Sequence, residues 1–404
     1  MLGDLAGLHL SAAFQPLMDL STARPVAAEA LLRPVHHGLP VPPAELLALA
    51  RAHGLVAELD LAAIRCAVQA PVGEARGTMF VNVEPATLVD RTQEVMDALD
   101  ARRPGLDVVV EVTERSLAAD PAGLLRAVDR LHAHGTPLAL DDVGAEPQSL
   151  ALLDLIRPAV VKLDMALLRG AGETTTLHIA GAVAGYAETT GARVVAEGIE
   201  TPRDLQRAQV LGADLGQGWL WGRESREWPA PGQHPVVAAR AVLPTQRAGA
   251  STPFTVVAGS RPVRTATKDL LVPLSLAVEA AAAAAPLPAV LLATFQHVRN
   301  VPTSTLTRYR EFASTLPVVG MIGESLTDLR VPGAHVSDIC ADDPLATEWT
   351  VVALGAQSAV ALVAREVPGQ VVRDRDRLFD FATTRDRRLV VAAARTLLAR
   401  LDRT

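Results

Sequence analysis

A chain of 404 residues is longer than one average domain, so the length alone predicts two domains. Hydrophobic residues make up 49% of the sequence and charged residues 21%, a balance that excludes a largely disordered protein. The formal net charge of −7 disfavours a protein that binds DNA or RNA through a basic surface.

Short apolar strands and longer amphipathic helices alternate through the first half of the chain. The predicted strands are 12–17, 27–32, 79–83, 107–112, 137–142, 159–163, 193–197 and 214–218. The predicted helices between them are 44–52, 59–70, 121–134, 174–190 and 202–211. This alternation of strands and helices fits a (β/α)8 barrel of the TIM type, which typically needs about 250 residues. A doubly wound sheet, the competing α/β architecture, would need a glycine-rich phosphate loop after its first strand, and the sequence has none there.

Residues 224–252 interrupt this alternation with repeated proline and glycine, which marks a linker. We therefore expect a barrel domain at 1–228, a linker at 229–252 and a second domain at 253–404. In the second domain, helices are predicted at 269–285, 303–315 and 378–401, and strands at 289–295, 318–322, 349–354 and 359–365. These elements predict a smaller α/β (α+β) domain.

The strand at 137–142 ends in two adjacent carboxylates, Asp141 and Asp142. Two carboxylates at the end of a buried strand are costly unless a cation binds there. Adjacent residues of a strand point to opposite faces, but the chain turns where the strand ends, so both side chains can reach one metal site. A helix N-cap is the structural alternative for Asp142.

Other predicted strands also end in a polar residue. These residues come from seven successive strands of the expected barrel: Glu29, Asn82, Glu111, Asp141 with Asp142, Lys162, Glu197 and Gln217. In a β/α barrel the active site lies at this end of the strands. Converging carboxylates repel one another by several kcal/mol unless cations lie between them, and oxygen ligands suit Mg²⁺ or Mn²⁺. Two such ions about 4 Å apart form a known arrangement for cleaving phosphoesters.

Taken singly, these residues also have structural explanations, such as a salt-bridge partner for Lys162 or a helix cap at Glu197. Their order and local sequences make a more specific pattern. The motifs are Phe14-Gln15-Pro16-Leu17, Glu29-Ala30-Leu31-Leu32-Arg33, Val81-Asn82-Val83-Glu84-Pro85, Glu111-Val112-Thr113-Glu114, Asp141-Asp142-Val143-Gly144, Val161-Lys162-Leu163-Asp164, Glu197-Gly198-Ile199-Glu200 and Gly216-Gln217-Gly218. Over residues 8–225 the chain thus resembles EAL domains, which hydrolyse the bacterial second messenger cyclic di-GMP. The resemblance implies a β/α barrel with an antiparallel first strand.

The resemblance also implies a role for each matched residue. Glu29, Asn82, Glu111 and Asp141 would bind one divalent ion, and Asp141, Asp142 and Glu197 would bind the second. Lys162 would orient the attacking water, so that Lys162, Glu29 and Glu197 form the catalytic set. Gln217 and Glu200 would support these ligands, and Gln15, Arg33 and Asp164 would contact the nucleotide. The implied reaction converts cyclic di-GMP to linear pGpG, in a homodimer formed through the barrel.

The sequence after the acidic pair departs from the family pattern. The family usually has Phe-Gly-Thr-Gly-Tyr-Ser-Ser-Leu there, whereas this chain has Val143-Gly144-Ala145-Glu146-Pro147-Gln148-Ser149-Leu150. The resemblance places this loop near the second ion and the dimer interface, with Glu114 as its anchor. Two alternatives to the enzyme follow: a module that binds cyclic di-GMP without cleaving it, and a scaffold that signals through its second domain. The complete set of metal ligands favours the enzyme.

The second domain carries motifs of its own: Ala293-Thr294-Phe295-Gln296, Arg308-Tyr309, Asp342-Asp343-Pro344-Leu345-Ala346-Thr347-Glu348-Trp349 and Ala361-Leu362-Val363-Ala364-Arg365. They resemble the DICT domain, a sensory module of bacterial signalling proteins. The resemblance implies regulation of the barrel and a signalling partner at the second domain. Asp342, Asp343 and Glu348 could form another metal site, but a capped turn before Trp349 is the simpler interpretation.

The two cysteines, Cys66 and Cys340, lie far apart and follow neither a disulfide nor a zinc pattern, which indicates the reducing cytoplasm. Residues 1–10 lack the basic region of a secretory signal. No apolar run reaches membrane-spanning length, so we expect no membrane insertion.

Overall fold

The computed structural model describes residues 7–70, 77–113, 119–144, 147–164, 169, 173–229, 236 and 251–401. The chain divides into two compact units. The first consists of Met1–Leu117, Ala127–Glu146 and Arg157–Leu243, and the second of Ala118–Arg126, Pro147–Ile156 and Pro244–Thr404. The expected domain limits of 1–228, 229–252 and 253–404 stay a prediction.

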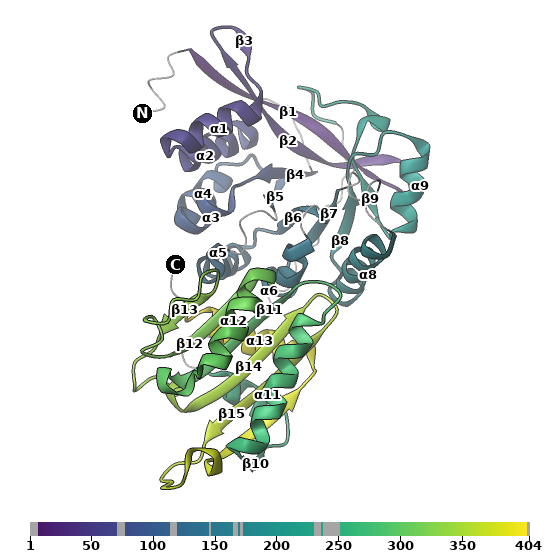
Figure 1. Cartoon of the computed structure of the whole chain (residues 1–404). Helices are drawn as coiled ribbons and strands as arrows, with labels where there is room; N and C mark the ends of the chain where they lie inside the picture. Colours follow the sequence, from purple (N-terminus) through teal and green to yellow (C-terminus); the bar gives the residue numbers. More distant parts are fainter. Residues whose placement is uncertain are drawn as a thin grey trace. The chain divides into compact units, whose positions relative to one another are not determined.

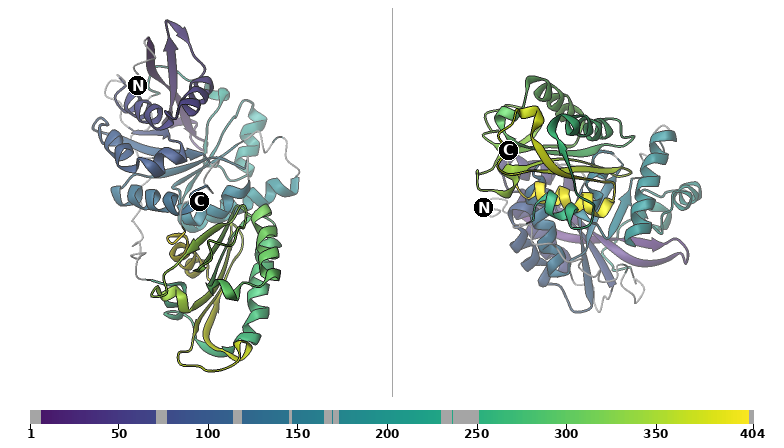
Figure 2. Two further views of the ribbon diagram at one scale, coloured as in Figure 1. Left: turned by 60° about the vertical axis from the view of Figure 1, so that its left-hand side comes forward. Right: turned by 90° about the horizontal axis from the view of Figure 1, so that it is seen from below.

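A closed sheet lies at the centre of the first unit (Figures 1 and 2). In the described part of the chain its strands are β1 (Leu8–Asp19), β2 (Arg24–His36), β3 (Leu39–Pro40), β4 (Gly77–Asn82), β5 (Leu106–Thr113), β6 (Leu138–Val143), β7 (Val160–Leu163), β8 (Arg193–Ala196) and β9 (Leu215–Gly216). Their order is β1-β9-β8-β7-β6-β5-β4-β2-β3, and a further pairing of β1 with β2 closes the barrel. β1 is antiparallel to β2 and β9, and the short β3 is antiparallel to β2. The other neighbouring strands of the sheet are parallel to one another. The predicted barrel and its antiparallel first strand are confirmed.

Helices connect the strands of the barrel on its outside (Figure 1). They are α1 (Pro43–His53), α2 (Val56–Val68), α3 (Pro85–Asp90), α4 (Thr92–Asp100), α5 (Pro121–His134), α8 (Glu173–Thr190) and α9 (Pro202–Val210), with the 3₁₀ turn η3 (Trp219–Trp221). The segment between β6 and β7 forms the 3₁₀ turn η2 (Pro147–Leu152) and α6 (Leu153–Ile156), which belong to the second unit. The five helices predicted for this half are present. The sequence pattern did not predict α3 and α4, which are too short to show a clear helical period. Among the described residues of the whole chain, no helix combines the length and apolar character needed to cross a bilayer.

A layer of apolar side chains fills the interior of the barrel. Each barrel strand contributes one residue to it: Leu17, Ala27, Phe80, Val109, Ala139, Val160, Val195 and Leu215. All of them are at most 1% exposed, with the large Phe80 beside small alanines. Such a layer makes the barrel a packed core rather than a pore, and it forms a floor for groups at the open end.

The second unit is a mixed sheet with helices on both faces (Figures 1 and 2). Its described strands are β10 (Arg264–Thr267), β11 (Ala289–His297), β12 (Val318–Glu324), β13 (His335–Asp338), β14 (Glu348–Gly355), β15 (Ala359–Glu366) and β16 (Leu378–Thr384), in the order β10-β16-β15-β14-β11-β12-β13. Helices α11 (Lys268–Ala283) and α12 (Thr303–Thr315) cover one face, and α10 (Pro253–Ala258) and α13 (Arg387–Leu398) cover the other. The expected α/β domain is confirmed.

The prediction of one long helix at 378–401 is wrong in its first part. Residues Leu378–Thr384 form β16, which pairs with β15 and β10. Helix α13 begins only after Asp386, whose carboxylate accepts a hydrogen bond from the Arg388 N–H at 3.0 Å. Because helices cover both faces of this sheet, apolar residues lie on both sides of β16 and the period of two is hidden.

The expected capped turn before Trp349 is confirmed. The Asp343 carboxylate accepts a hydrogen bond from the Leu345 N–H at 2.8 Å. Glu348 is completely buried and already bonded: it accepts from the Phe254 N–H at 3.1 Å and pairs with Arg365 Nη2 at 2.8 Å. Protein donors therefore satisfy this carboxylate, which argues against the alternative of a metal site.

The segment Pro147–Ile156 follows the acidic pair in the chain but belongs to the second unit. Within that unit, the Asp154 carboxylate pairs with Arg387 of α13, and the Leu155 carbonyl accepts a hydrogen bond from Arg395 Nη1 at 2.7 Å. Ala145 and Glu146 of the loop that departs from the family pattern, and its proposed anchor Glu114, lie outside the described residues.

Candidate active site

The predicted site residues form one layer directly above the apolar layer of the barrel. On each parallel strand the site residue lies two positions beyond the apolar one, as Glu29 lies beyond Ala27, Glu111 beyond Val109 and Lys162 beyond Val160. Residues two apart on a strand point to the same face, so these side chains enter the barrel interior. The same spacing applies to Asn82, Asp141, Glu197 and Gln217, and to Gln15, which precedes Leu17 because β1 runs in the opposite direction.

Lys162 lies at the centre of this layer and is completely buried. Its ammonium Nζ lies 2.7 Å from Glu197 Oε1, 2.8 Å from Glu111 Oε1, 3.0 Å from Asp141 Oδ1 and 3.4 Å from Glu29 Oε2. Lysine and arginine together number 38, yet lysine occurs only here and at Lys268. A compact ammonium can contact several carboxylates at once, whereas the planar guanidinium of arginine favours one or two partners in its plane.

Burial and the neighbouring charges shift the pKa values of the side chains in this layer. Burial opposes the charge of Lys162, but the surrounding carboxylates, Glu111 first, hold its pKa well above the ordinary value. Burial and repulsion from Glu29 raise the pKa of Glu111 well above its usual range. Burial likewise raises the pKa of Glu197 to about 8. Without further positive charge, the site therefore retains protons on acidic groups that would otherwise be ionised near neutral pH.

Glu29 is held by two amides. Asn82 Nδ2 donates to Glu29 Oε1 at 2.8 Å, and Gln217 Nε2 donates to Glu29 Oε2 at 2.7 Å. Gln217 Nε2 also donates to Gln15 Oε1 at 3.0 Å, so Gln15 joins the network from β1. Burial opposes ionisation of Glu29, yet Lys162 and the two amides lower its pKa below the ordinary value. Glu29 is thus ionised and fixed in orientation, as a metal ligand must be.

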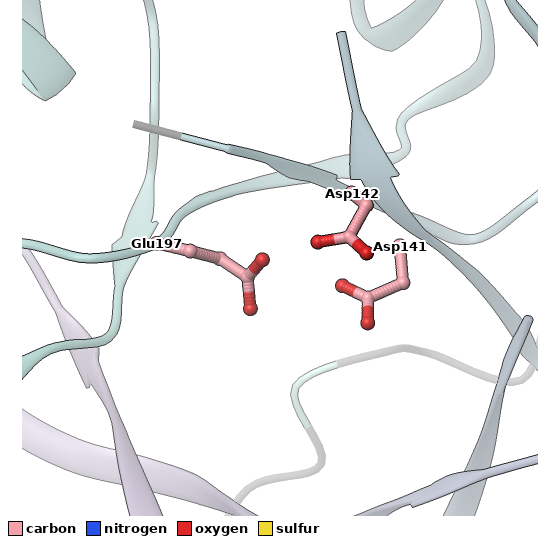
Figure 3. Close-up of side chains that lie close together, drawn as sticks. All are labelled: Asp141, Asp142 and Glu197. Carbon is pink, nitrogen blue, oxygen red and sulfur yellow. The ribbon is translucent and has the colours of Figure 1, made fainter. Parts of the chain in front are cut away.

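Asp142 reaches the same site through an irregularity in β6. The pairing of β6 with β7 shifts register between Leu140 and Val143, and Asp142 has a left-handed backbone with φ of 55°. Such a bulge turns a side chain that would otherwise point away from the interior. The carboxylates of Asp141, Asp142 and Glu197 point toward one another (Figure 3), and one oxygen of each lies within 4.8 Å of the others. The helix-cap alternative for Asp142 is not needed to explain this geometry.

The residues fit divalent metal ions. All the candidate ligand atoms are oxygens of carboxylates and an amide, which Mg²⁺ and Mn²⁺ prefer. Glu111 Oε2 and Gln217 Oε1 are buried and have no hydrogen-bond partner among the described residues. Buried polar atoms are almost always satisfied in native proteins, so an unpaired oxygen in an acidic cluster indicates a missing cation or water.

The structure places the remaining predicted residues around this layer. Asp164 directly follows β7, and its N–H donates to the Val143 carbonyl at 3.4 Å. Arg33 pairs with Glu224 at 2.6 Å, a partner that the sequence analysis missed. Glu200 lies 3.9 Å from Arg169, another residue without an assigned role. Such partners come from distant parts of the chain and leave no local signal in the sequence.

A cavity of about 290 Å³ lies beside this layer, between β2, β4, α1 and α2. Its lining includes Leu31 and Arg33 of β2, Asn82, and the buried Asp60. The Asp60 carboxylate accepts a hydrogen bond from the Glu84 N–H at 3.0 Å. Burial nevertheless raises the pKa of Asp60 to about 6.

We expect Asp60→Asn to stabilise the protein by about 1–3 kcal/mol at pH 8, because the raised pKa means that the ionised carboxylate is disfavoured in the fold. This penalty is complete above pH 6 and disappears as the pH falls below the ordinary value of 3.8, where Asp60 becomes protonated in both states. Asparagine keeps an acceptor for the Glu84 N–H. Urea unfolding of both proteins at pH 8 and pH 4 measures the effect, and an equal difference at the two pH values would contradict it.

Comparisons with known proteins match both parts of the chain to known families. A family model described as "EAL domain" matches residues 3–224, and one described as "Sensory domain in DIguanylate Cyclases and Two-component system", DICT, matches 255–367. The chain is 30% identical over 230 residues to "Cyclic di-GMP phosphodiesterase PA2567" of Pseudomonas aeruginosa, covering 54% of this chain and 38% of that protein. It is 31% identical over 238 residues to "Cyclic di-GMP phosphodiesterase RocR" of the same species, covering 56% and 59%.

Among solved structures, the chain is similar to Klebsiella pneumoniae BlrP1 in a manganese and cyclic di-GMP complex, at 29% identity and a TM-score of 0.46, covering 54% of this chain and 56% of that chain. The chain spans less than two thirds of the length of the two curated relatives. The EAL model, however, matches more than half of the chain, in the part that forms the barrel. The protein therefore belongs to the EAL domain family and carries a DICT domain after its barrel.

Proposed function

We propose that this protein hydrolyses cyclic di-GMP to linear pGpG with two divalent ions, Mg²⁺ or Mn²⁺, bound at the open end of the barrel. The observation that supports this most is the convergence of Glu29, Glu111, Asp141 and Glu197 on one buried ammonium. The names of two relatives, both cyclic di-GMP phosphodiesterases, support this substrate.

The charge of the site supports two ions. Five carboxylates, those of Glu29, Glu111, Asp141, Asp142 and Glu197, and one ammonium give a formal charge of −5 + 1 = −4 when all are ionised. Two divalent ions carry +4. Bound there, they would bring the pKa of a water molecule toward neutrality and offset the charge that develops on the phosphoryl oxygens.

The protein's own residues prepare the reaction. Lys162, held in place by its carboxylate contacts, would donate a hydrogen bond that orients the attacking water. Asn82 Nδ2 donates a hydrogen bond to Glu29, so the Asn82 Oδ1 would be the atom that binds a cation. Arg33 lines the cavity next to Asn82, where a basic side chain suits a nucleotide; Gln15 and Asp164 would contact it as well.

Incubation of the full chain with cyclic di-GMP and Mn²⁺ or Mg²⁺ is expected to yield pGpG, detected by chromatography. A chelator should abolish cleavage, and added Mn²⁺ should restore it, because the carboxylates cannot replace the positive charge. Equilibrium dialysis with cyclic di-GMP distinguishes the alternatives. Nucleotide that is bound but not cleaved would identify a receptor, and no binding would leave a scaffold that acts through the DICT domain.

Other features of the proposal concern the setting of the enzyme. We keep as predictions a homodimer formed through the barrel, regulation by the DICT domain, a signalling partner at that domain and a cytoplasmic location. Size measurement of the purified protein at several concentrations tests the dimer. Comparison of turnover for the full chain and for residues 1–228 tests the regulation.

A further inference from the structure

Arg169 lies at the open end of the barrel, beside the loop after β8. It follows β7 and Lys162 in the chain, and its guanidinium reaches the loop after β8. Arg169 Nη2 donates to the Gly198 carbonyl at 2.7 Å. The same group contacts Asp204 Oδ2 at 2.6 Å, and Nε donates to Asp204 Oδ1 at 3.1 Å. These contacts are bidentate to the carboxylate, which is the best-defined geometry of an arginine ion pair.

Gly198 comes directly after Glu197, a proposed metal ligand. The hydrogen bond from Arg169 to the Gly198 carbonyl therefore holds the main chain next to that ligand. Backbone hydrogen bonds hold the loop on its other sides. The Glu197 N–H donates to the Leu163 carbonyl at 2.9 Å, and the Ile199 N–H donates to the Gln217 carbonyl at 3.0 Å. Gly198 itself has φ of 62°, a left-handed conformation that suits glycine. Arg169 thus supplies a side-chain anchor to a loop otherwise held by its main chain.

The Glu197 side chain depends on this anchor more than its neighbours do. It is 20% exposed, whereas Glu111 and Lys162 are at most 1% exposed and are held by packing on all sides. Its carboxylate contacts Lys162 Nζ at 2.7 Å, and the position from which it reaches that ammonium is set by its main chain. Errors near 1 Å in such a group are large enough to impair a metal site or the reaction there.

The other end of the Arg169 contact is rigid. Asp204 forms a capping box at the start of α9: its carboxylate accepts from the Thr201 N–H at 3.0 Å and from Thr201 Oγ1 at 2.8 Å. The Asp204 side chain is only 6% exposed. Hydrogen bonds from Thr201 and Arg169 outweigh burial and lower its pKa to about 2, so it stays ionised as a partner for arginine.

We propose that Arg169 is a positioning residue, which holds the Glu197 carboxylate in place for divalent metal ions by joining the Gly198 carbonyl to the start of α9. The inference rests on the proposed function, because it takes Glu197 as a metal ligand. Arginine suits this task because its planar fork bonds the carbonyl and the carboxylate together, whereas lysine offers one compact donor group. Mutation of a residue that hydrogen-bonds to a metal ligand or its surroundings typically lowers metal affinity by about 10–100-fold.

The test is a calorimetric titration of the purified full chain with Mn²⁺ and no substrate. Arg169→Ala should bind Mn²⁺ about 10–100-fold more weakly than the unchanged protein. Arg169→Lys should show a smaller loss of Mn²⁺ affinity. Arg207→Ala is the matched control, since Arg207 Nη1 lies 3.7 Å from the same Asp204 carboxylate but belongs to α9. This variant should bind Mn²⁺ normally. Thermal unfolding of each variant shows whether the fold is retained.

Equal Mn²⁺ affinity in Arg169→Ala and the unchanged protein would overturn the inference while leaving the proposed function intact. An equal loss in Arg169→Ala and Arg207→Ala would also overturn it, because the cause would then be the charge around Asp204 rather than the bond to Gly198. If the unchanged protein itself bound no Mn²⁺, both the inference and the proposed metal chemistry would fail.

Discussion

Replacing Lys162 with alanine is expected to slow the cleavage of cyclic di-GMP by about 10²-fold or more, as the loss of a water-positioning or electrostatic group does. Its ammonium is the positive charge on which the Glu111 and Glu197 carboxylates converge, at 2.8 and 2.7 Å. Metal ions and nucleotide should still bind, because the oxygen ligands all remain. Rates of pGpG formation, measured beside Mn²⁺ and cyclic di-GMP affinities, separate the two effects.

The same variant should lose about 3–5 kcal/mol of stability in metal-free buffer, because removing one partner leaves buried charges without compensation. Added Mn²⁺ should restore most of the loss, which urea unfolding with and without the ion would show. Lys268→Ala is the control: this other lysine pairs with the exposed Asp374 and should affect neither stability nor rate appreciably. Full activity in Lys162→Ala would remove the residue from the mechanism.

Replacing Glu29 with glutamine is expected to weaken the binding of metal ions, whereas the Lys162 variant slows the cleavage step. Glutamine has nearly the same shape, but its one carbonyl oxygen can accept from either Asn82 or Gln217, which donate to the two oxygens of Glu29 at 2.8 and 2.7 Å. It lacks the charge that a divalent ion requires. We expect Mn²⁺ affinity to fall by more than about 10²-fold, beyond the effect of residues that only support a ligand. Turnover should fall with it and recover in part at high Mn²⁺.

Calorimetric titration with Mn²⁺ checks this result directly. Glu45→Gln, which makes the same chemical change at an exposed position of α1, serves as the control and should bind Mn²⁺ normally. Unchanged Mn²⁺ affinity in Glu29→Gln would remove Glu29 from the ligand set. Together with Lys162→Ala, this variant distinguishes a residue that binds metal from one that acts on the water.

The site could be predicted from the sequence because its signal is local to each strand. An apolar run with a polar residue at its end marks a strand that enters the site, as at Glu29, Glu111 and Lys162. Parallel strands bring those ends to one edge of the barrel, so the residues meet without further information. The local pattern did not predict β16, where apolar residues such as Leu378 and Phe379 lie on both faces of the strand. It also did not predict α3 and α4, because these elements are short.

The sequence by itself determined the barrel, the DICT-like second domain and the set of polar residues at the strand ends, since all of these depend on local hydrophobic pattern and on motifs. Only the tertiary structure decided how the residues meet. It showed that Lys162 contacts four carboxylates and that a register shift turns Asp142 toward Asp141. It also showed that Arg169 bonds the carbonyl beside Glu197. The physical reason is that such contacts depend on barrel closure and strand register, which join residues far apart in the chain.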